Sequence, residues 1–196
     1  MTERTAEVER NTKETRIRVR LNIDGRGRTD IASGIPFLDH MLTLTATHGF
    51  MDASIAAQGD LEVDFHHTVE DLGLVLGEAL DRALGDRKGI RRFGHAVTPM
   101  DDALAAVTID LSKRPYLVCH LPEGMGPAGL FAPHLVKEFC RALATRAGMN
   151  LHIRVAYGDD PHHIIEAVFK SLGRALAQAA GLDARISGVR STKGAI

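Results

Sequence analysis

The sequence predicts an α+β fold built from two similar half-domains, because one motif occurs twice. His66-His67-Thr68-Val69-Glu70 returns 96 residues later (162 − 66) as His162-His163-Ile164-Ile165-Glu166. Small and apolar residues beyond the motif agree at the same offset, namely Leu76 with Leu172, Gly77 with Gly173, Ala79 with Ala175 and Leu80 with Leu176. Self-similarity at a fixed spacing indicates an internal duplication. We therefore expect the two motifs at equivalent positions of two similar halves.

The residues that follow each motif predict a helix. Apolar side chains recur at helical intervals in both copies, at Leu72, Leu76 and Leu80 in the first and at Ile165, Phe169 and Leu172 in the second. On a helix, the glutamate of each motif lies four residues after one histidine and three after the other. All three side chains can then leave one region of the helix surface.

The first half is predicted to begin with strands. Residues 15 to 24 alternate polar and apolar side chains, which indicates a strand with one buried face and residues 6 to 10 as its hairpin partner. A helix is expected from Gly34-Ile35-Pro36, because proline is well tolerated in a first helical turn. The expected elements that follow are strands 53–57 and 61–65 and the first motif helix, to about residue 85.

The second half repeats this plan after a basic, glycine-rich connector at 86–94. The expected elements are strands 102–111 and 115–121, a loop 122–129, a helix 133–147, a strand 150–157 and the second motif helix. Each half thus reads β-β-α-β-α, with helices on one face of a mostly antiparallel sheet. We expect the half-domains at 1–92 and 93–196. The tail at 186–194 has no apolar period and alone predicts a frayed terminus.

Composition excludes several classes of function. The 196 residues carry a net charge of −1 and no tryptophan, which argues against nucleic acid and anionic membranes as partners. Neither a secretory signal nor a membrane-spanning apolar run is visible. The two cysteines, Cys119 and Cys140, lie in apolar segments and are expected to be free, buried thiols. These features favour the cytoplasm.

The duplicated motif favours metal binding. One histidine pair alone is more typical of a solvated helix start, but two pairs in equivalent places favour ligands. Imidazole with carboxylate and no thiolate suits Mn, Fe, Co, Ni or Zn. Two ions, each held by a few histidines and one glutamate, would keep coordination positions open for a substrate. The HExxH motif of zinc proteases and the phosphate-binding GxxxxGK loop are absent.

At this point five segments together resemble one enzyme family, the imidazoleglycerol-phosphate dehydratases of histidine biosynthesis. They follow one another in order along nearly the whole chain: 34–41 (GIPFLDHM), 66–71 (HHTVED), 110–116 (DLSKRPY), 162–170 (HHIIEAVFK) and 191–194 (STKG). The resemblance implies a duplicated fold like that of ribosomal protein S5 domain 2. It also implies a shell of twenty-four subunits with sites between subunits.

The implied reaction converts imidazole glycerol phosphate to imidazole acetol phosphate and water, with two manganese ions per site. Carried over by position, one ion would bind His66, His162, Glu166 and the residue at 138, and the other His40, His67, Glu70 and His163. Many family members have histidine at position 138, where this chain has Glu138, and His134 is the local substitute one turn earlier.

The resemblance also assigns roles to the substrate-facing residues. Glu14 matches the proposed acid/base, although a carboxylate between two strands is usually only a solvated loop residue. His48 is assigned with it to catalysis. The residues expected to grip the substrate and its phosphate are Arg92, Arg114, Lys170, Ser191, Thr192 and Lys193. Without an anionic ligand, the basic members of this set would simply be surface charge.

The chemistry makes sense of the two-ion pattern. The C–H bond to be broken is not acidified by a carbonyl, so the imidazole ring must supply the electrons that expel the hydroxyl group. Held between two cations through both ring nitrogens, the ring would lose its N–H proton and expel the neighbouring hydroxyl, after which Glu14 removes a proton. Two other classes stay open: a dinuclear metallohydrolase acting on phosphoesters, and a metal-binding protein without catalytic activity.

Overall fold

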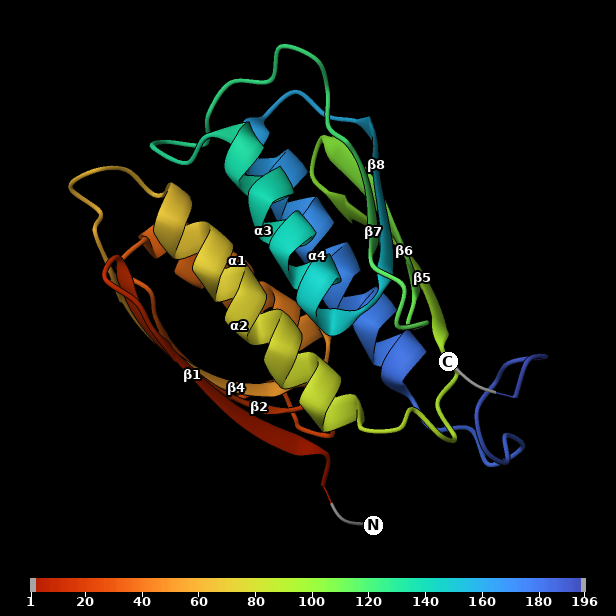
Figure 1. The fold of residues 1–196 in the computed structure, drawn as a ribbon. Helices are drawn as coiled ribbons and strands as arrows, with labels where there is room; N and C mark the ends of the chain where they lie inside the picture. The colour runs from red at the N-terminus through yellow and green to blue at the C-terminus, as the bar shows by residue number, and fades with distance from the viewer. Residues whose placement is uncertain (1–2, 195–196) are drawn as a thin grey trace.

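The computed structural model describes residues 3–194. Two four-stranded sheets form the outer layers, and four helices lie between them (Figure 1). In each half, therefore, helices cover one face of a sheet. The duplicated α+β fold is confirmed.

The first half supplies one sheet and two helices. In the strand order β1-β2-β4-β3, β2 pairs antiparallel with both β1 and β4, whereas β3 runs parallel to β4. The elements are β1 (Thr5–Asn11), β2 (Thr15–Asn22), β3 (Thr29–Ala32), α1 (Pro36–His48), β4 (Asp52–Gly59) and α2 (His66–Leu84).

The second half repeats this topology strand for strand. Its sheet has the order β5-β6-β8-β7, again with two antiparallel pairs and one parallel pair. The elements are β5 (Phe93–Met100), β6 (Ala103–Asp110), β7 (Tyr116–His120), α3 (Pro133–Ala147), β8 (Asn150–Tyr157) and α4 (Pro161–Ala180).

Each half contains one strand that the sequence pattern did not indicate. β3 has only four residues and lies at a sheet edge, and β5 begins inside the segment expected to be a connector and contains Pro99. The strand expected at 61–65 is wrong. The chain turns there, with the Val63 amide donating to the Asp60 carbonyl at 2.9 Å, and Val63 is 66% exposed.

The helices of the two halves pack across the duplication. α2 packs on α3, and α4 packs on α1. Gly77 of α2 and its counterpart Gly173 of α4 allow the closest approach. A Cβ on Gly77 would lie 2.7 Å from the Leu143 carbonyl oxygen, and one on Gly173 would collide with the Thr45 carbonyl oxygen. These paired contacts place the N-termini of the four helices at the same end of the molecule (Figure 1).

A buried arginine links the far ends of α2 and α3. Arg87 is 1% exposed and has a left-handed backbone, with φ of 58°. Its guanidinium donates to the carbonyl oxygens of Ala147 and Gly148, and it pairs with Asp81. It thereby satisfies carbonyl groups that the end of a helix leaves free.

Two further sequence predictions concern the thiols and membranes. Cys119 and Cys140 are free, and burial raises the pKa of the half-buried Cys119 thiol to about 11. Within residues 3–194, no helix is both long enough and apolar enough to span a membrane.

Candidate metal centre

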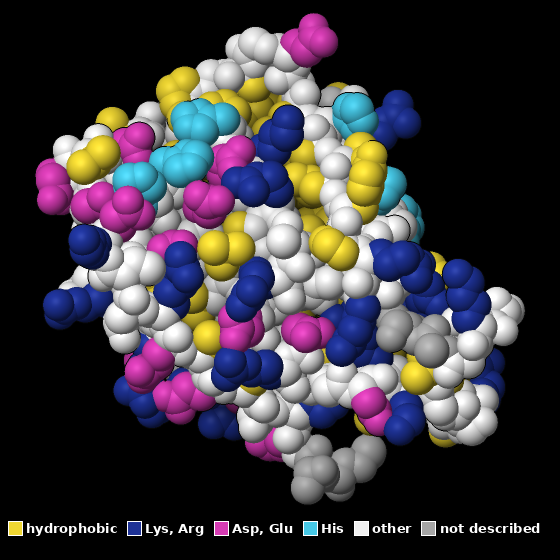
Figure 2. All heavy atoms as spheres, viewed as in Figure 1, with side chains coloured by type: hydrophobic (Ala, Val, Ile, Leu, Met, Phe, Trp, Pro, Cys, Tyr) yellow, Lys and Arg dark blue, Asp and Glu magenta, His cyan; other side chains and the backbone are white. Residues whose placement is uncertain are grey.

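The two motifs begin α2 and α4, and each is preceded by a helix-starting aspartate. The Asp64 carboxylate accepts the backbone N–H of His66 at 2.6 Å, and Asp160 accepts that of His162 at 2.7 Å. This carboxylate satisfies one of the N–H groups that a helix start leaves unpaired. Histidine side chains gather with acidic side chains at this end of the molecule, in the upper part of Figure 2.

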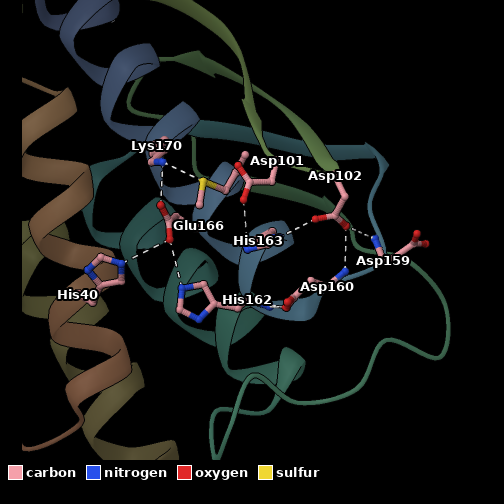
Figure 3. Close-up of polar contacts among 10 residues, drawn as sticks. His40, Asp101, Asp102, Asp159, Asp160, His162, His163, Glu166 and Lys170 are labelled. Atoms are coloured by element: carbon pink, nitrogen blue, oxygen red, sulfur yellow. Dashed lines mark hydrogen bonds and ion pairs between the residues drawn. The ribbon is translucent and has the colours of Figure 1, made fainter.

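Three predicted ligands meet at the start of α4. His40 of α1 lies with His162 and Glu166, and one donor atom from each falls within 4.8 Å of the others. The Glu166 Oε2 atom is 3.4 Å from His40 Nε2 and 3.2 Å from His162 Nε2 (Figure 3). The first half thus donates His40 to the motif of the second half.

Glu166 is held in its ionised form. Its side chain is only 8% exposed, and this burial opposes ionisation. The hydrogen bond from Lys170, whose Nζ lies 2.7 Å from Oε1, and those from the two histidines outweigh burial and lower the pKa of Glu166. An ionised carboxylate with one oxygen facing two imidazoles is suited to binding a divalent cation.

The second histidine of each motif is oriented by a carboxylate. His67 Nδ1 lies 2.9 Å from Asp60 Oδ2, and His163 Nδ1 lies 2.6 Å from Asp102 Oδ1 (Figure 3). These hydrogen bonds raise the pKa of both imidazoles. A carboxylate on Nδ1 fixes the tautomer of a histidine and directs Nε2 toward a metal.

The corresponding cluster at the start of α2 contains an arginine. His66 Nε2 lies 3.5 Å from Glu70 Oε2, and Arg141 Nη2 donates to Glu70 Oε1 at 2.9 Å. The same guanidinium binds Glu138. The structure thus brings Glu138 near Glu70, whereas His134 lines a separate recess of about 310 Å³ with Asp64 and Leu130.

The two motifs stay apart within one chain. Among residues 3–194, no hydrogen bond or ion pair joins a residue of the first motif to one of the second. The predicted ligand sets each draw on both motifs, whereas the three donors that converge among the described residues, those of His40, His162 and Glu166, include none from the first motif. One chain alone therefore does not bring either set together. His40 lies at Glu166, although the resemblance assigns these two residues to different ions.

The two expected catalytic residues have different surroundings. Glu14 is exposed, and its carbonyl oxygen accepts the N–H of Asp60 at 3.2 Å, which places it beside the carboxylate that orients His67. His48 is half-buried at the end of α1. Burial lowers the pKa of His48, and the charges of Lys170 and Arg174 lower it further, so its imidazole is neutral at pH 7.

Most of the expected phosphate-binding residues lie at the opposite end of the molecule. Arg92 and Arg114 share Asp110, at 2.6 Å and 3.5 Å, and Arg92 also donates to the Arg190 carbonyl oxygen within the tail. The Arg92 amide binds the Ala179 carbonyl oxygen near the end of α4. This point is about 25 Å from His162, because a helix rises about 1.5 Å per residue.

The remaining members of this set divide between the two ends. Lys170 lies one turn from Glu166, at the motif end. Ser191, Thr192 and Lys193 form a turn in the tail, where the Lys193 amide binds the Ser191 hydroxyl at 3.2 Å. Ser191 and Lys193 expose polar groups suited to an anion.

Four residues of the site were not predicted: Asp60, Asp102, Asp110 and Arg141. The sequence did contain a hint of Asp102: it directly precedes β6, just as Glu14 directly precedes the equivalent strand β2. Asp110 and Arg141 are recognised from contacts with residues 18 and 71 positions away, and Asp60 from the turn that brings it to His67, seven residues later.

Comparison with known proteins identifies the family. The family model described as Imidazoleglycerol-phosphate dehydratase matches residues 33–176. The chain belongs to the imidazoleglycerol-phosphate dehydratase family. A dehydratase of this name from Pelobacter propionicus is 56% identical, with 98% of this chain and 99% of the relative covered. One from Clostridium botulinum (strain Langeland) is 55% identical over the full length of both chains.

Solved structures of imidazoleglycerol-phosphate dehydratases have the same fold as this chain. The imidazoleglycerol-phosphate dehydratase of Staphylococcus aureus matches with a TM-score of 0.82 and 36% identity, covering 91% of this chain and 99% of that chain. The Pyrococcus furiosus enzyme in complex with (S)-C348 matches with a TM-score of 0.84 and 40% identity, covering 96% and 100%. The family resemblance of the motifs is therefore confirmed, and the chain is a hydro-lyase of histidine biosynthesis.

Proposed function

We propose that the chain catalyses the manganese-dependent dehydration of D-erythro-1-(imidazol-4-yl)glycerol 3-phosphate to 3-(imidazol-4-yl)-2-oxopropyl phosphate, in the cytoplasm. The observation that carries the proposal is the duplicated His-His-x-x-Glu helix start in a chain of the dehydratase family. In both copies the first histidine faces the glutamate, and the second is oriented by an aspartate.

The donor set fits two divalent ions. The imidazole and carboxylate donors of His40, His162 and Glu166 converge within 4.8 Å, with Nε2 atoms facing an ionised carboxylate. The residues that would hold the ions are His40, His66, His67, Glu70, Glu138, His162, His163 and Glu166. When bound, two cations supply positive charge that stabilises the anionic form of an imidazole ring.

The remaining residues bind the substrate and move protons. Glu14 is exposed beside the first motif, where its carboxylate can take the proton whose loss gives the enol of the product. The neutral His48 lies within reach of the charge of Lys170, which is one turn from Glu166, so it can take part in proton movement at the motif end. Arg92, Arg114 and the tail residues Ser191, Thr192 and Lys193 supply cations and hydroxyls for the phosphate.

A complete site requires several copies of the chain. The motif end and the phosphate end are separated along α4, and the two motifs do not meet in one chain. We propose a homo-oligomer in which these ends come together between subunits, with twenty-four subunits as the resemblance implies. Symmetric assembly is the usual way in which identical chains complete such sites.

The direct test is turnover of the imidazole glycerol phosphate by purified protein that has been stripped with a chelator and refilled with Mn²⁺. Metal content is measured on the same samples. We expect activity to vanish on stripping and to return at two ions per chain. Refilled protein that binds two ions but leaves this substrate intact, and instead cleaves generic phosphoesters, would show a metallohydrolase.

A further inference from the structure

The duplication relates the two ligand clusters residue by residue. After α1 the Met51 amide donates to the Ala46 carbonyl, and after α3 the Met149 amide donates to the Ala144 carbonyl, so the two helices correspond at an offset of 98 (144 − 46) and Glu138 is the counterpart of His40. His40 meets Glu166 of α4, and Glu138 approaches Glu70 of α2. The two clusters are therefore versions of one arrangement, in which one helix contributes a His-x-x-x-Glu pair and its neighbour contributes a third ligand.

The clusters differ in the cation that each contains. In the α4 cluster, Lys170 holds only the rear oxygen of Glu166, and Oε2 stays with the two histidines. In the α2 cluster, the counterpart of Lys170 is Leu74, which carries no charge. In the α2 cluster the cation that binds the glutamate is Arg141, which comes from α3. The residue of α1 that corresponds to Arg141 is the uncharged Thr43.

Arg141 ties two expected ligands together. A single guanidinium nitrogen, Nη2, binds Glu70 Oε1 at 2.9 Å and also binds Glu138. These two carboxylates come from different helices and are assigned to the two different ions. A guanidinium cannot lose its proton in a protein. Its charge therefore leaves this position only when the side chain moves away.

We propose that Arg141 is an internal counter-ion of the metal-free site, which incoming metal must displace from Glu70 and Glu138. The inference rests on the two-ion site proposed above. Charge-assisted hydrogen bonds between the guanidinium and the carboxylates have to break before an ion uses the same oxygens. The displaced charge also stays close enough to repel the ion. The Arg141 side chain is 49% exposed, so it can move into solvent when a metal ion binds the two carboxylates.

The proposal predicts two opposite effects of removing the charge. In Arg141→Gln, the Mn²⁺ concentration for half-loading should fall at least about tenfold. The melting temperature of the metal-free protein should fall as well, because Glu70 and Glu138 lose the charge that separates them. An arginine with a merely structural role would weaken metal binding together with stability.

The measurement is a Mn²⁺ titration of chelator-stripped protein, with free Mn²⁺ followed by electron paramagnetic resonance. The matched control is Arg146→Gln, because Arg146 also lies on α3 and pairs with a glutamate of α2, Glu78, which is not an expected ligand. Arg141→Lys is the second variant. It keeps one charge but lacks the planar fork, and we expect it to tighten binding less than Arg141→Gln does.

The outcomes separate this inference from the site on which it rests. Wild-type protein that takes up no Mn²⁺ overturns both. Wild-type protein that binds two ions, with Arg141→Gln binding as Arg146→Gln does or more weakly, overturns only the role of Arg141. If Arg141→Gln does not fold, Arg141→Lys decides the matter, and unchanged or weaker binding contradicts the proposal.

Discussion

Carboxylates that orient the motif histidines come from different places in the two halves. Asp60 follows β4 in the first half, and Asp102 precedes β6 in the second. Both nevertheless reach Nδ1 of the second motif histidine, at 2.9 Å and 2.6 Å. The duplicated chain has thus preserved the orientation of His67 and His163 while the residue that provides it has changed.

Asp102→Asn should weaken metal binding. An asparagine oxygen still accepts the N–H groups of Asp159 and Asp160, but it no longer holds His163 as a carboxylate does. Loss of such a partner typically lowers metal affinity about 10- to 100-fold. Isothermal titration with Mn²⁺ measures the effect, with Asp30→Asn on the exposed surface of β3 as control. Equal affinity in both variants would show that Asp102 does not position His163.

The residue types of the motifs were predictable from the sequence, but the residues that contact the motif side chains, such as Asp60 and Arg141, were not. The repeat of His and Glu at helical spacing predicted the pairing of the first histidine with the glutamate in each half, and Glu166 with His162 forms such a pair. Asp60 and Arg141 act through contacts with residues seven and 71 positions away. Neither contact follows a local periodicity: packing of α2 against α3 creates the Arg141 contact, and the turn between β4 and α2 creates that of Asp60.

Close packing of helices from opposite halves sets the position of the motifs. α4 approaches α1 at Gly173, and α2 approaches α3 at Gly77, so each motif helix is anchored about two turns below its ligands. Each pair brings one ligand from the neighbouring half to the motif. Small residues at these crossings therefore serve the geometry of the proposed metal centre.

Gly173→Ala should destabilise the protein. Its Cβ would collide with the Thr45 carbonyl oxygen, and backbone cannot move aside as a flexible side chain can. Overpacking of this kind costs about 1–3 kcal/mol of unfolding free energy. Guanidinium chloride unfolding measures the loss, with Gly126→Ala as control because a Cβ there meets no atom within 4 Å. A stability equal to that of the control would contradict the close approach of α4 and α1.

The ion pair of Glu78 and Arg146 should make the α2–α3 contact sensitive to acid. The hydrogen bond from Arg146 lowers the pKa of Glu78 below its ordinary value of 4.5. The stabilisation is therefore present above about pH 4.5 and is lost as the pH falls through the lowered pKa of the folded state. Glu78→Gln should lose about 0.5 kcal/mol at pH 7 and less than that at pH 2. Thermal unfolding at both pH values tests this, and an equal loss at both would contradict it.

Element boundaries followed from the sequence where the pattern was long. α3 and β8 lie at the predicted residues, 133–147 and 150–157. β3 and β5 were missed because their evidence lies elsewhere: β3 takes its register from β4, and β5 pairs with β6 despite Pro99. Edge strands are defined by their neighbours more than by their own residues.

The whole molecule separates the expected metal ligands from the expected phosphate-binding residues. The motifs lie at the end where the helices start, and Arg92, Arg114 and the tail lie near the end of α4. The duplication was readable from the repeat, but this separation was not, because it depends on the direction in which α4 and the strands run. It is the strongest structural support for sites shared between copies.

The most direct test of shared sites is complementation between two inactive variants. His162→Ala removes a ligand at the motif end, and Arg92→Ala removes a phosphate-binding group at the other end. Each variant alone should be inactive. Dissociated, mixed in equal amounts and reassembled, they should regain up to about a quarter of wild-type turnover, because random assembly pairs two intact ends in that fraction of sites. Reassembled mixtures that stay inactive, while wild-type protein recovers under the same treatment, would contradict sites formed between subunits.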